Sequence, residues 1–352
     1  MATTGYETTE FAGTATSNAT IEGYAASSAG AELTPYRFEA RALRPHDVEI
    51  DVTHCGICHT DLHLLDNDWG MTAFPFVPGH EVVGTVSRVG SAVTTLQVGQ
   101  RVGVGFLAGA DFTCDACVEG LDNFCENWEP TCIGRPGGYA EKLVADSRLA
   151  FPIPDALASE HAAPLMCAGV TVFAPLLRHA TPSTRVGVLG IGGLGHLAIQ
   201  FAHKFGCHVT AFTTSPEKMK EARKLGAHEV VDVNEPGAIA AQANRCDLLL
   251  CTATSDVPWN EYVGVLRRNG KLCLLGIPPH DITVSAIPLI FFQRSVVASG
   301  IGSRLEMRRM LDFAALHGIA PEVELFPMRD ANRALERLRK NEVRYRAVLT
   351  NE

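Results

Sequence analysis

Three glycines at the junction between an apolar strand and a helix constrain the fold of this chain more than any other feature. Residues 185–189 form a short apolar run, and Gly190, Gly192 and Gly195 follow it directly. Apolar residues then recur at helical spacing until Gly206 ends the pattern. The first glycine permits a tight turn, the second lets backbone approach a pyrophosphate, and the third allows close packing of helix on strand. This motif predicts a dinucleotide bound at the amino end of the helix.

The segments that follow this motif alternate between strand and helix patterns. Such alternation is typical of a doubly wound parallel sheet with helices on both faces. The predicted strands are 208–214, 229–233, 247–253, 271–277 and 295–301. The predicted helices are 216–225, 259–268, 305–317 and 331–341. We therefore assign residues 168–301 to a Rossmann domain that binds a dinucleotide, in a chain of the α/β class.

Residues 21–167 have a different pattern, in which short β-branched runs and glycines predominate. The clearest predicted strands are 48–52, 82–89 and 101–104. A last predicted strand at 345–350 is expected to return to the same domain. The sequence thus predicts a small, mostly-β catalytic domain made of residues 21–167 and 302–352.

Length and charge narrow the range of functions. A chain of 352 residues exceeds what one hydrophobic core usually serves, which favours two domains. Hydrophobic residues make up 46% and charged residues 20%, as in soluble globular proteins. The net charge of −9, with no basic stripe to relieve it, argues against a nucleic-acid partner. A small anionic cofactor needs only local positive potential and stays compatible with this charge.

The N-terminal region and the cysteines bear on the compartment. Residues 1–20 are rich in Thr, Ala, Ser and Gly without periodicity, which predicts a flexible tail. No basic region followed by an apolar block opens the chain, so we expect no secretory signal. The eleven cysteines are then expected to stay reduced in the cytoplasm. We also expect that the chain does not span a membrane, since no apolar run approaches the ~20 residues that a membrane-spanning helix requires.

One short segment carries several groups that are suited to catalysis. Cys58 and His80 offer the sulfur and nitrogen ligands that zinc prefers, and a carboxylate, Glu81, follows directly. Because 21 residues separate Cys58 from His80, they lie on different elements, unlike the closely spaced ligand pairs of a zinc finger. The segment predicts a catalytic metal that needs a third protein ligand further along the chain.

The choice between NAD and NADP depends on the end of the second Rossmann strand. An NAD-preferring site carries Asp or Glu there to bond the ribose 2′-hydroxyl. Here Thr213 takes that place, so no carboxylate repels a 2′-phosphate. The hydroxyls of Thr213, Thr214 and Ser215 and the charge of Lys218 favour NADP(H). Ser215 followed by Pro216 is also compatible with an ordinary helix cap.

Several motifs distributed over residues 30–350 occur together. They are Cys-Gly-Ile-Cys-His-Thr-Asp (55–61), Asn-Asp-Trp-Gly-Met (67–71), Val-Pro-Gly-His-Glu (77–81), Pro-Leu-Met-Cys-Ala-Gly-Val-Thr (164–171), Gly-Ile-Gly-Gly-Leu-Gly-His (190–196) and Val-Arg-Tyr-Arg (343–346). In these motifs the chain resembles the medium-chain zinc-dependent alcohol dehydrogenases, and most closely the cinnamyl-alcohol-dehydrogenase-like branch. The resemblance implies a GroES-like catalytic domain beside the Rossmann domain, and a homodimer.

The resemblance also supplies a ligand set for the catalytic zinc. It implies that Cys58, His80 and Cys167 hold the ion and leave one position open for water or substrate. Glu81 resembles the carboxylate that transiently joins the metal during ligand exchange. Asp61 resembles the acceptor that orients His80, although a loop acid exposed to solvent is the alternative. Cys55, in the same motif as Cys58, is interpreted as a buried thiol.

Further residues take their expected roles from the same resemblance. Thr60 is expected to accept the alcohol proton first, with His63 completing a relay to water, unless His63 is simply a packed imidazole. His59 and Arg346 are expected at the pyrophosphate. Further cofactor contacts are expected at Thr171, Gly193, Leu194, Thr252, Ile277 and Ile301.

A second metal site departs from the family pattern. Relatives carry four cysteines with two, two and seven residues between them. In this chain Cys114, Cys117 and Cys125 keep the last three positions, and Asp111 replaces the first. A carboxylate binds zinc, so one aspartate and three cysteines form a reasonable structural site, with Cys132 as a competing fourth ligand. The alternative is a metal-free lobe with reduced cysteines.

The expected activity is reduction of aldehydes, or oxidation of primary alcohols, with NADP(H). The resemblance places an apolar substrate pocket, suited to aromatic or medium-length aliphatic substrates, at Trp69, Met71, Trp128, Phe291, Phe292 and Ile301. Each of these residues is equally compatible with plain core packing, and Phe291 and Phe292 also with a subunit contact. Two alternatives remain: a polyol or secondary-alcohol dehydrogenase on the same fold, and a non-catalytic nucleotide-binding protein. The intact Cys58, His80 and Cys167 oppose the second.

Overall fold

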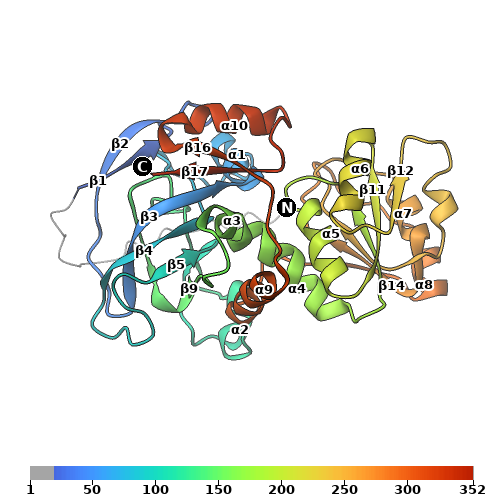
Figure 1. Ribbon diagram of the computed structural model, residues 1–352, viewed down its shortest axis with the longest axis horizontal. Helices are drawn as coiled ribbons and strands as arrows, with labels where there is room; N and C mark the ends of the chain where they lie inside the picture. Colours follow the sequence, from blue (N-terminus) through green and yellow to red (C-terminus); the bar gives the residue numbers. More distant parts are fainter. Residues whose placement is uncertain (1–19, 352) are drawn as a thin grey trace.

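Two β-sheets lie at opposite ends of an elongated molecule, with helices packed between them (Figure 1). The computed structural model describes residues 20–351, so the predicted N-terminal tail lies outside the described residues except for Thr20. The sheet on the right in Figure 1 is wholly parallel and the sheet on the left is mostly antiparallel. The predicted fold class, a mostly-β domain beside a doubly wound Rossmann domain, is confirmed.

The catalytic-domain sheet has the order β16-β17-β3-β4-β5-β9. Strand β8 pairs with residues 47–51 of β3, on the same side as β17, which pairs with residues 54–57. Its strands are β3 (Asp47–Ile57), β4 (Val82–Val89), β5 (Arg101–Val104), β8 (Lys142–Asp146), β9 (Ala150–Pro152), β16 (Val323–Pro327) and β17 (Arg346–Thr350). In β3 the apolar side chains of Val48, Ile50 and Val52 are buried in the domain core. The last strand, β17, pairs antiparallel with β3, so the chain end returns to the first sheet as predicted.

Smaller elements surround this sheet. Two antiparallel two-stranded sheets are β1 (Thr20–Ala25) with β2 (Thr34–Glu39), and β6 (Leu107–Gly109) with β7 (Glu129–Pro130). The α-helices are α1 (His59–Asp66), α2 (Asp115–Val118) and α10 (Ala331–Arg339), and short 3₁₀ turns occupy Asp122–Phe124, Ser147–Leu149 and Met328–Asp330. Helices α1 and α10 lie together along one side of the sheet (Figure 1).

The Rossmann sheet has the order β12-β11-β10-β13-β14-β15, with every neighbouring pair parallel. Its strands are β10 (Arg185–Leu189), β11 (His208–Thr213), β12 (Glu229–Asp232), β13 (Cys246–Cys251), β14 (Leu266–Leu274) and β15 (Ser295–Ala298). Its helices are α5 (Gly195–Lys204), α6 (Pro216–Lys224), α7 (Trp259–Val265) and α8 (Ala286–Phe292), with a 3₁₀ turn at Ala240–Gln242. The strand order reverses between β10 and β13, and in such sheets ligands bind at that point, beyond the carboxyl ends of the strands.

One predicted helix boundary is wrong. The helix predicted over 259–268 ends at Val265, and Leu266 already belongs to β14. Leu266 is fully buried and pairs with Cys246 of the neighbouring strand. Tertiary pairing of a buried residue therefore overrides the helical pattern of the local sequence.

Helices that connect the two sheets fill the centre of the molecule. The run from Ser159 to His179 consists of α3 (Ser159–Pro164), a π-helical turn (Leu165–Gly169) and α4 (Val170–His179), and α9 (Arg304–His317) packs against it. By length and composition this run passes as a membrane span, which the sequence expectation overlooked. However, 78% of its most apolar window is buried inside the protein, as in the core helix of a folded domain.

Candidate active site

Asp61 organises the segment that carries Cys58 and His80. Its side chain is fully buried and accepts three hydrogen bonds. One oxygen accepts from the Cys58 backbone N–H (2.9 Å), at the start of α1, and the other accepts from the Gly79 N–H (3.0 Å) and lies 3.1 Å from His80 Nδ1. Asp61 is therefore no exposed loop acid. It ties the amino end of α1 to the loop before β4 and fixes the orientation of the His80 ring.

Four side chains converge next to this carboxylate. One ligand atom each from Cys58, His80, Glu81 and Cys167 lies within 4.8 Å of the others. Cys167 comes from the π-helical turn, a distortion that is frequent at functional sites. His80 Nε2 is buried and has no hydrogen-bond partner, so its lone pair is free for a metal. Two sulfurs and one imidazole nitrogen form a donor set that fits zinc.

The thiols in this cluster are electrostatically prepared to bind a cation. A hydrogen bond with Cys167 lowers the pKa of the Cys58 thiol well below its usual value, and His80 and Arg346 act in the same direction. The same bond raises the pKa of Cys167, because one proton is shared between the two sulfurs. A divalent cation would replace that proton and allow both residues to bind as thiolates.

Glu81 connects the cluster to the glycine motif. Burial raises the pKa of Glu81 to about 7, although the guanidinium of Arg346 opposes this shift. Arg346, at the start of β17, contacts both carboxylate oxygens of Glu81, one at 2.6 Å. A Cβ atom added at Gly193 would lie 2.8 Å from the same guanidinium. A single buried arginine thus touches both the metal-ligand cluster and the nucleotide turn.

The glycine motif forms a cradle at the carboxyl end of β10. Gly190 has a φ of +88°, which favours glycine, and a Cβ at Gly195 would lie 1.9 Å from the Gly190 carbonyl oxygen. A Cβ at Gly192 would meet no atom within 4 Å, so open space remains where a pyrophosphate would approach. The Thr252 hydroxyl, 3.0 Å from the carbonyls of Leu189 and Gly190, holds the turn. These residues fit a dinucleotide.

The end of β11 carries hydroxyls and no carboxylate. Ser215 accepts from the Lys218 N–H (3.3 Å) and caps α6, so the helix-cap interpretation is correct for this residue. Thr213 is buried, and its hydroxyl accepts from the Ser215 N–H (3.2 Å). Burial lowers the pKa of Lys218, and the positive charge of Arg344 adds to that effect. The sequence interpretation missed Arg344, which comes from the segment before β17.

Beyond Cys58, α1 carries the residues predicted for proton transfer. His59 and Thr60 occupy its first turn. His63 Nδ1 lies 2.7 Å from Asp68, and its ring stacks on Trp69 at 5.0 Å between ring centres. About a third of the His63 side chain is exposed, which opens it to exchange with water.

An aromatic pair covers one side of the cluster. Phe106, which follows β5, makes an edge contact with the His80 ring at 5.4 Å, and Trp128 packs on Phe106 at 5.7 Å. Trp128 therefore lies near the cluster as expected, whereas Phe106 was not singled out from the sequence. Met71 is partly buried against the core of the catalytic domain.

Phe291 and Phe292 are not brought to this cluster. They lie on α8, at the end of the molecule farthest from the catalytic domain (Figure 1). Phe291 is 78% exposed. An expected pocket role within the same chain therefore has no geometric support, and the alternative of a subunit contact fits their exposure better.

The remaining cofactor candidates lie at the ends of helices and strands. Thr171 is buried in the first turn of α4, and Leu194 follows Gly193 in the turn before α5. Ile277 is exposed beyond the end of β14. Ile301, in the connection from β15 to α9, has a φ of +37° and is partly buried in the central core.

A second cluster forms in the lobe between β6 and β7. Ligand atoms of Asp111, Cys114, Cys117 and Cys125 lie within 4.8 Å of one another. Cys125 Sγ accepts backbone N–H groups of Asp111 (3.4 Å) and Asn127 (3.3 Å). Its ligand types also suit zinc.

Two of these four groups show opposite shifts in pKa. Backbone hydrogen bonds from Thr113 and Cys114 keep the pKa of Asp111 well below its usual range, so this carboxylate is ionised. Burial raises the pKa of Cys117 to about 12.

The suggestion that Cys132 competes for this lobe is wrong. Cys132 lies instead with Asp61 and His80, within 4.8 Å of their ligand atoms, and is 1% exposed. The chain passes from the lobe into β7 before it reaches Cys132, and β7 pairs with β6. Residues close in sequence are thereby separated in space.

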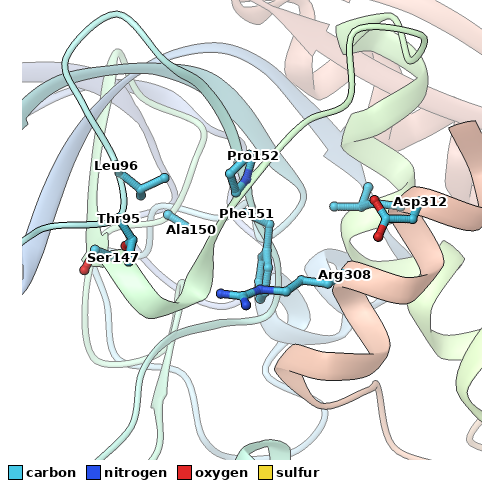
Figure 2. Close-up of a pocket in the computed structure, with 9 residues that line it drawn as sticks. Thr95, Leu96, Ser147, Ala150, Phe151, Pro152, Arg308 and Asp312 are labelled. Carbon is cyan, nitrogen blue, oxygen red and sulfur yellow. The ribbon is translucent and has the colours of Figure 1, made fainter.

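A surface cavity of about 240 Å³ lies apart from all these groups, and none of the predicted site residues lines it. Arg308 and Asp312 extend into it from α9, opposite Phe151 and Pro152 (Figure 2). We assign this cavity no role in the reaction.

Comparisons with known proteins agree with this geometry. The family model for the alcohol dehydrogenase GroES-like domain matches residues 44–155, and the model for zinc-binding dehydrogenases matches residues 193–315. The aldehyde reductase AdhA of Synechocystis is 40% identical over 332 residues, which cover 94% of this chain and 99% of that protein.

Two solved structures share the whole architecture. A cinnamyl alcohol dehydrogenase from Sorghum bicolor is 38% identical with a TM-score of 0.91, covering 94% of this chain and 98% of that one. CAD from Helicobacter pylori, solved in complex with NADP(H), is 30% identical with a TM-score of 0.87 and covers the same shares. The chain therefore belongs to the zinc-dependent alcohol dehydrogenases, within the group of cinnamyl alcohol dehydrogenases and related aldehyde reductases.

Proposed function

We propose that this protein reduces aldehydes to primary alcohols, and oxidises the alcohols in reverse, with NADP(H) and a zinc ion held by Cys58, His80 and Cys167. The observation that carries this proposal is the free, buried Nε2 of His80 between two thiols, on the far side of the ring from the Asp61 carboxylate. Zinc bound there supplies a Lewis acid that polarises the substrate oxygen, and NADPH supplies the hydride.

The residues of the chain would bind, orient and move protons. Asp61 fixes His80 so that Nε2 faces the two sulfurs. Phe106 and Trp128 exclude water from one side of the cluster. Thr60 lies in the turn after Cys58 and would exchange a proton with the substrate oxygen, and His63, which is partly exposed and held by Asp68, would pass it to water. Glu81, which pairs with Arg346, would bind the zinc ion transiently during ligand exchange.

Preference for NADP(H) rests on the end of β11. There Thr213, Thr214 and Ser215 supply hydroxyls, Lys218 follows in the first turn of α6, and no acidic residue stands at the end of the strand. A 2′-phosphate would meet donors and positive charge, whereas NADH would gain nothing from them. His59 and Arg346 would contact the pyrophosphate, and the Arg346 guanidinium already lies next to Gly193 of the glycine turn.

The apolar wall formed by Phe106 and Trp128 favours aromatic or medium-length aliphatic substrates over polyols. Turnover of cinnamaldehyde, octanal and sorbitol with each cofactor tests this. We expect cinnamaldehyde with NADPH to give the highest kcat/KM. Faster oxidation of sorbitol than reduction of either aldehyde would establish the polyol alternative, and cofactor binding without any turnover would indicate a nucleotide-binding protein.

We further propose that Asp111, Cys114, Cys117 and Cys125 hold a structural zinc ion. Asp111 Oδ1 accepts two backbone N–H groups, whereas Oδ2 accepts only from Asn127 Nδ2 and keeps a lone pair for a metal. All four groups lie close enough to share one ion. We take residues 21–167 and 302–352 as the catalytic domain and residues 168–301 as the nucleotide domain.

A homodimer is also proposed, formed through the free edge of the Rossmann sheet. At that edge lies β15, and nearby α8 exposes large apolar side chains: Ile287 (67%), Ile290 (70%) and Phe291 (78%). A soluble monomer rarely exposes such a group. Light scattering should give twice the chain mass, and Phe291→Glu should shift the protein towards monomer. All eleven cysteines are free, which supports a cytoplasmic location.

A further inference from the structure

The segment that links β15 to α9 lies where cofactor chemistry is expected. Residues 299–303, here called the crossing segment, leave the carboxyl end of a parallel strand and include Ile301 with its φ of +37°. Ile301 lines a small cavity together with Phe106, which contacts His80, and Val170, which directly precedes the cofactor candidate Thr171. Whatever holds the crossing segment in place therefore influences how well the nucleotide site is formed.

The cysteine lobe (residues 111–125) holds one side of this segment. Asp122 is 2% exposed, and one of its oxygens accepts from Arg304 Nε (2.9 Å) while the other accepts from the Arg304 backbone N–H (3.1 Å). The next residue, Asn123, donates its amide to the Gly300 carbonyl (3.2 Å). The ring of Phe112 lies between the guanidinium groups of Arg148 (3.7 Å) and Arg304 (4.6 Å). The lobe thus contacts Gly300 within the crossing segment and Arg304 directly after it.

A second anchor holds the same segment without involving the lobe. Arg178 of α4 donates to Ser299 Oγ (3.3 Å) and pairs with Glu306 (2.7 Å). Glu306 in turn accepts the Ser303 backbone N–H (2.8 Å). The crossing segment therefore has two independent supports, and only the support through Asp122 depends on how the lobe is folded.

The lobe has little regular structure to fix Asp122 by itself. Its only helices are the four-residue α2 and the three-residue turn Asp122–Phe124. Three of the four proposed metal ligands precede Asp122 and the fourth, Cys125, follows it by three residues. A metal bound by that set closes a loop around Asp122 and so reduces the freedom of its side chain.

We propose that Asp122 is a positioning residue through which metal in the cysteine lobe tightens binding of the nicotinamide cofactor. The inference rests on the proposed function of the nucleotide site. Metal in the lobe orders Asp122, Asp122 fixes Arg304 and Gly300, and these hold Ile301 at the cofactor. Because such coupling is reciprocal, bound NADPH must raise the affinity of the lobe for its metal by the same factor.

A double-mutant cycle on NADPH affinity tests this coupling. The dissociation constant of NADPH is measured by nicotinamide fluorescence, without substrate, for the zinc-loaded wild type and for Cys114→Ser, Asp122→Asn and Arg178→Gln, alone and combined. Zinc is counted for each variant. We expect Cys114→Ser to remove one zinc and to weaken NADPH binding roughly 5- to 10-fold, within the ~5–150-fold range of such couplings.

The combined variants discriminate between the two anchors. Asp122→Asn added to Cys114→Ser should weaken NADPH binding no further, because both changes interrupt one connection. Arg178→Gln added to Cys114→Ser should multiply the two losses, since that anchor is separate. Multiplied losses for Cys114→Ser with Asp122→Asn, or unchanged NADPH affinity in Cys114→Ser, would overturn the proposal. Asp122→Glu should recover part of the affinity that Asp122→Asn loses.

Hydrogen exchange tests the same coupling in the wild-type protein, so its result does not depend on whether the variants fold. With NADPH present, amides of residues 111–125 should exchange more slowly than in the free enzyme, whereas amides of the β1–β2 pair, at the end of the molecule away from the Rossmann sheet (Figure 1), should not change. Equal exchange in the lobe with and without NADPH would refute the coupling. If wild-type protein bound no NADPH at all, the proposed function itself would fail, and that outcome is separate from loss of coupling.

Discussion

Replacement of Asp61 by asparagine tests whether this carboxylate holds His80 in the orientation that binds the metal. The asparagine carbonyl can still accept from Gly79 and His80, but its NH₂ group then faces the Cys58 N–H, donor against donor. A buried unsatisfied donor costs about 1–3 kcal/mol. Loss of a carboxylate that orients a metal-binding histidine lowers metal affinity by ~10–100-fold. Asp61→Ala removes all three hydrogen bonds and should lower the free energy of unfolding about three times as much as Asp61→Asn does.

The assay is competition for zinc against a chromogenic chelator, with urea unfolding of the same samples. Asp61→Asn should bind the catalytic zinc more weakly and recover activity when zinc is added in excess. Asp66→Asn is the matched control, because Asp66 lies on the same helix but pairs with the surface residue Arg339. Its effect should stay below about 1 kcal/mol. Wild-type zinc affinity in Asp61→Asn would refute the assigned role of this carboxylate.

Three further predictions concern the cofactor, acid stability and the second metal. Thr213→Asp should shift the ratio of kcat/KM values from NADPH towards NADH, because the new carboxylate repels a 2′-phosphate; an unchanged ratio would mean that the phosphate is held elsewhere. Burial lowers the pKa of His196 to about 3, against ~6.5 unfolded, so the unfolded chain binds the extra proton and stability falls as pH drops below ~6.5. His196→Gln should therefore lose about 2 kcal/mol less than wild type between pH 7 and pH 5 in urea titrations, and equal losses would contradict this shift. Metal analysis should give two zinc ions per wild-type chain and one in Cys114→Ser, whereas one in both would mean that the cysteine lobe is empty.

The nucleotide-binding architecture was accessible from the sequence because local rules determine it. The strand Arg185–Leu189, its glycine turn and the following helix depend on short-range periodicity and on backbone positions that only glycine tolerates. The metal-ligand cluster needed the family resemblance, since no local rule joins Cys167 to Cys58 across more than a hundred residues.

Features that depend on how distant segments pack were not predictable in the same way. Arg344 lies beside Lys218 only because the chain end returns across the domain boundary. Phe106 contacts His80 because the chain after β5 runs past the histidine ring. Cys132 lies away from the cysteine lobe because β7, which precedes it, pairs with β6. Local sequence signals contain no information about these approaches, which tertiary contacts decide.

The central claim is that one zinc ion sits between Cys58, His80 and Cys167, and anomalous diffraction from zinc-loaded crystals tests it most directly. Data collected above and below the zinc absorption edge should show a peak ~2.3 Å from both sulfurs and ~2.0–2.1 Å from His80 Nε2. A second peak is expected among Asp111, Cys114, Cys117 and Cys125. Absence of the first peak in fully zinc-loaded protein, or a His80 ring turned away from the two sulfurs, would contradict the proposed chemistry.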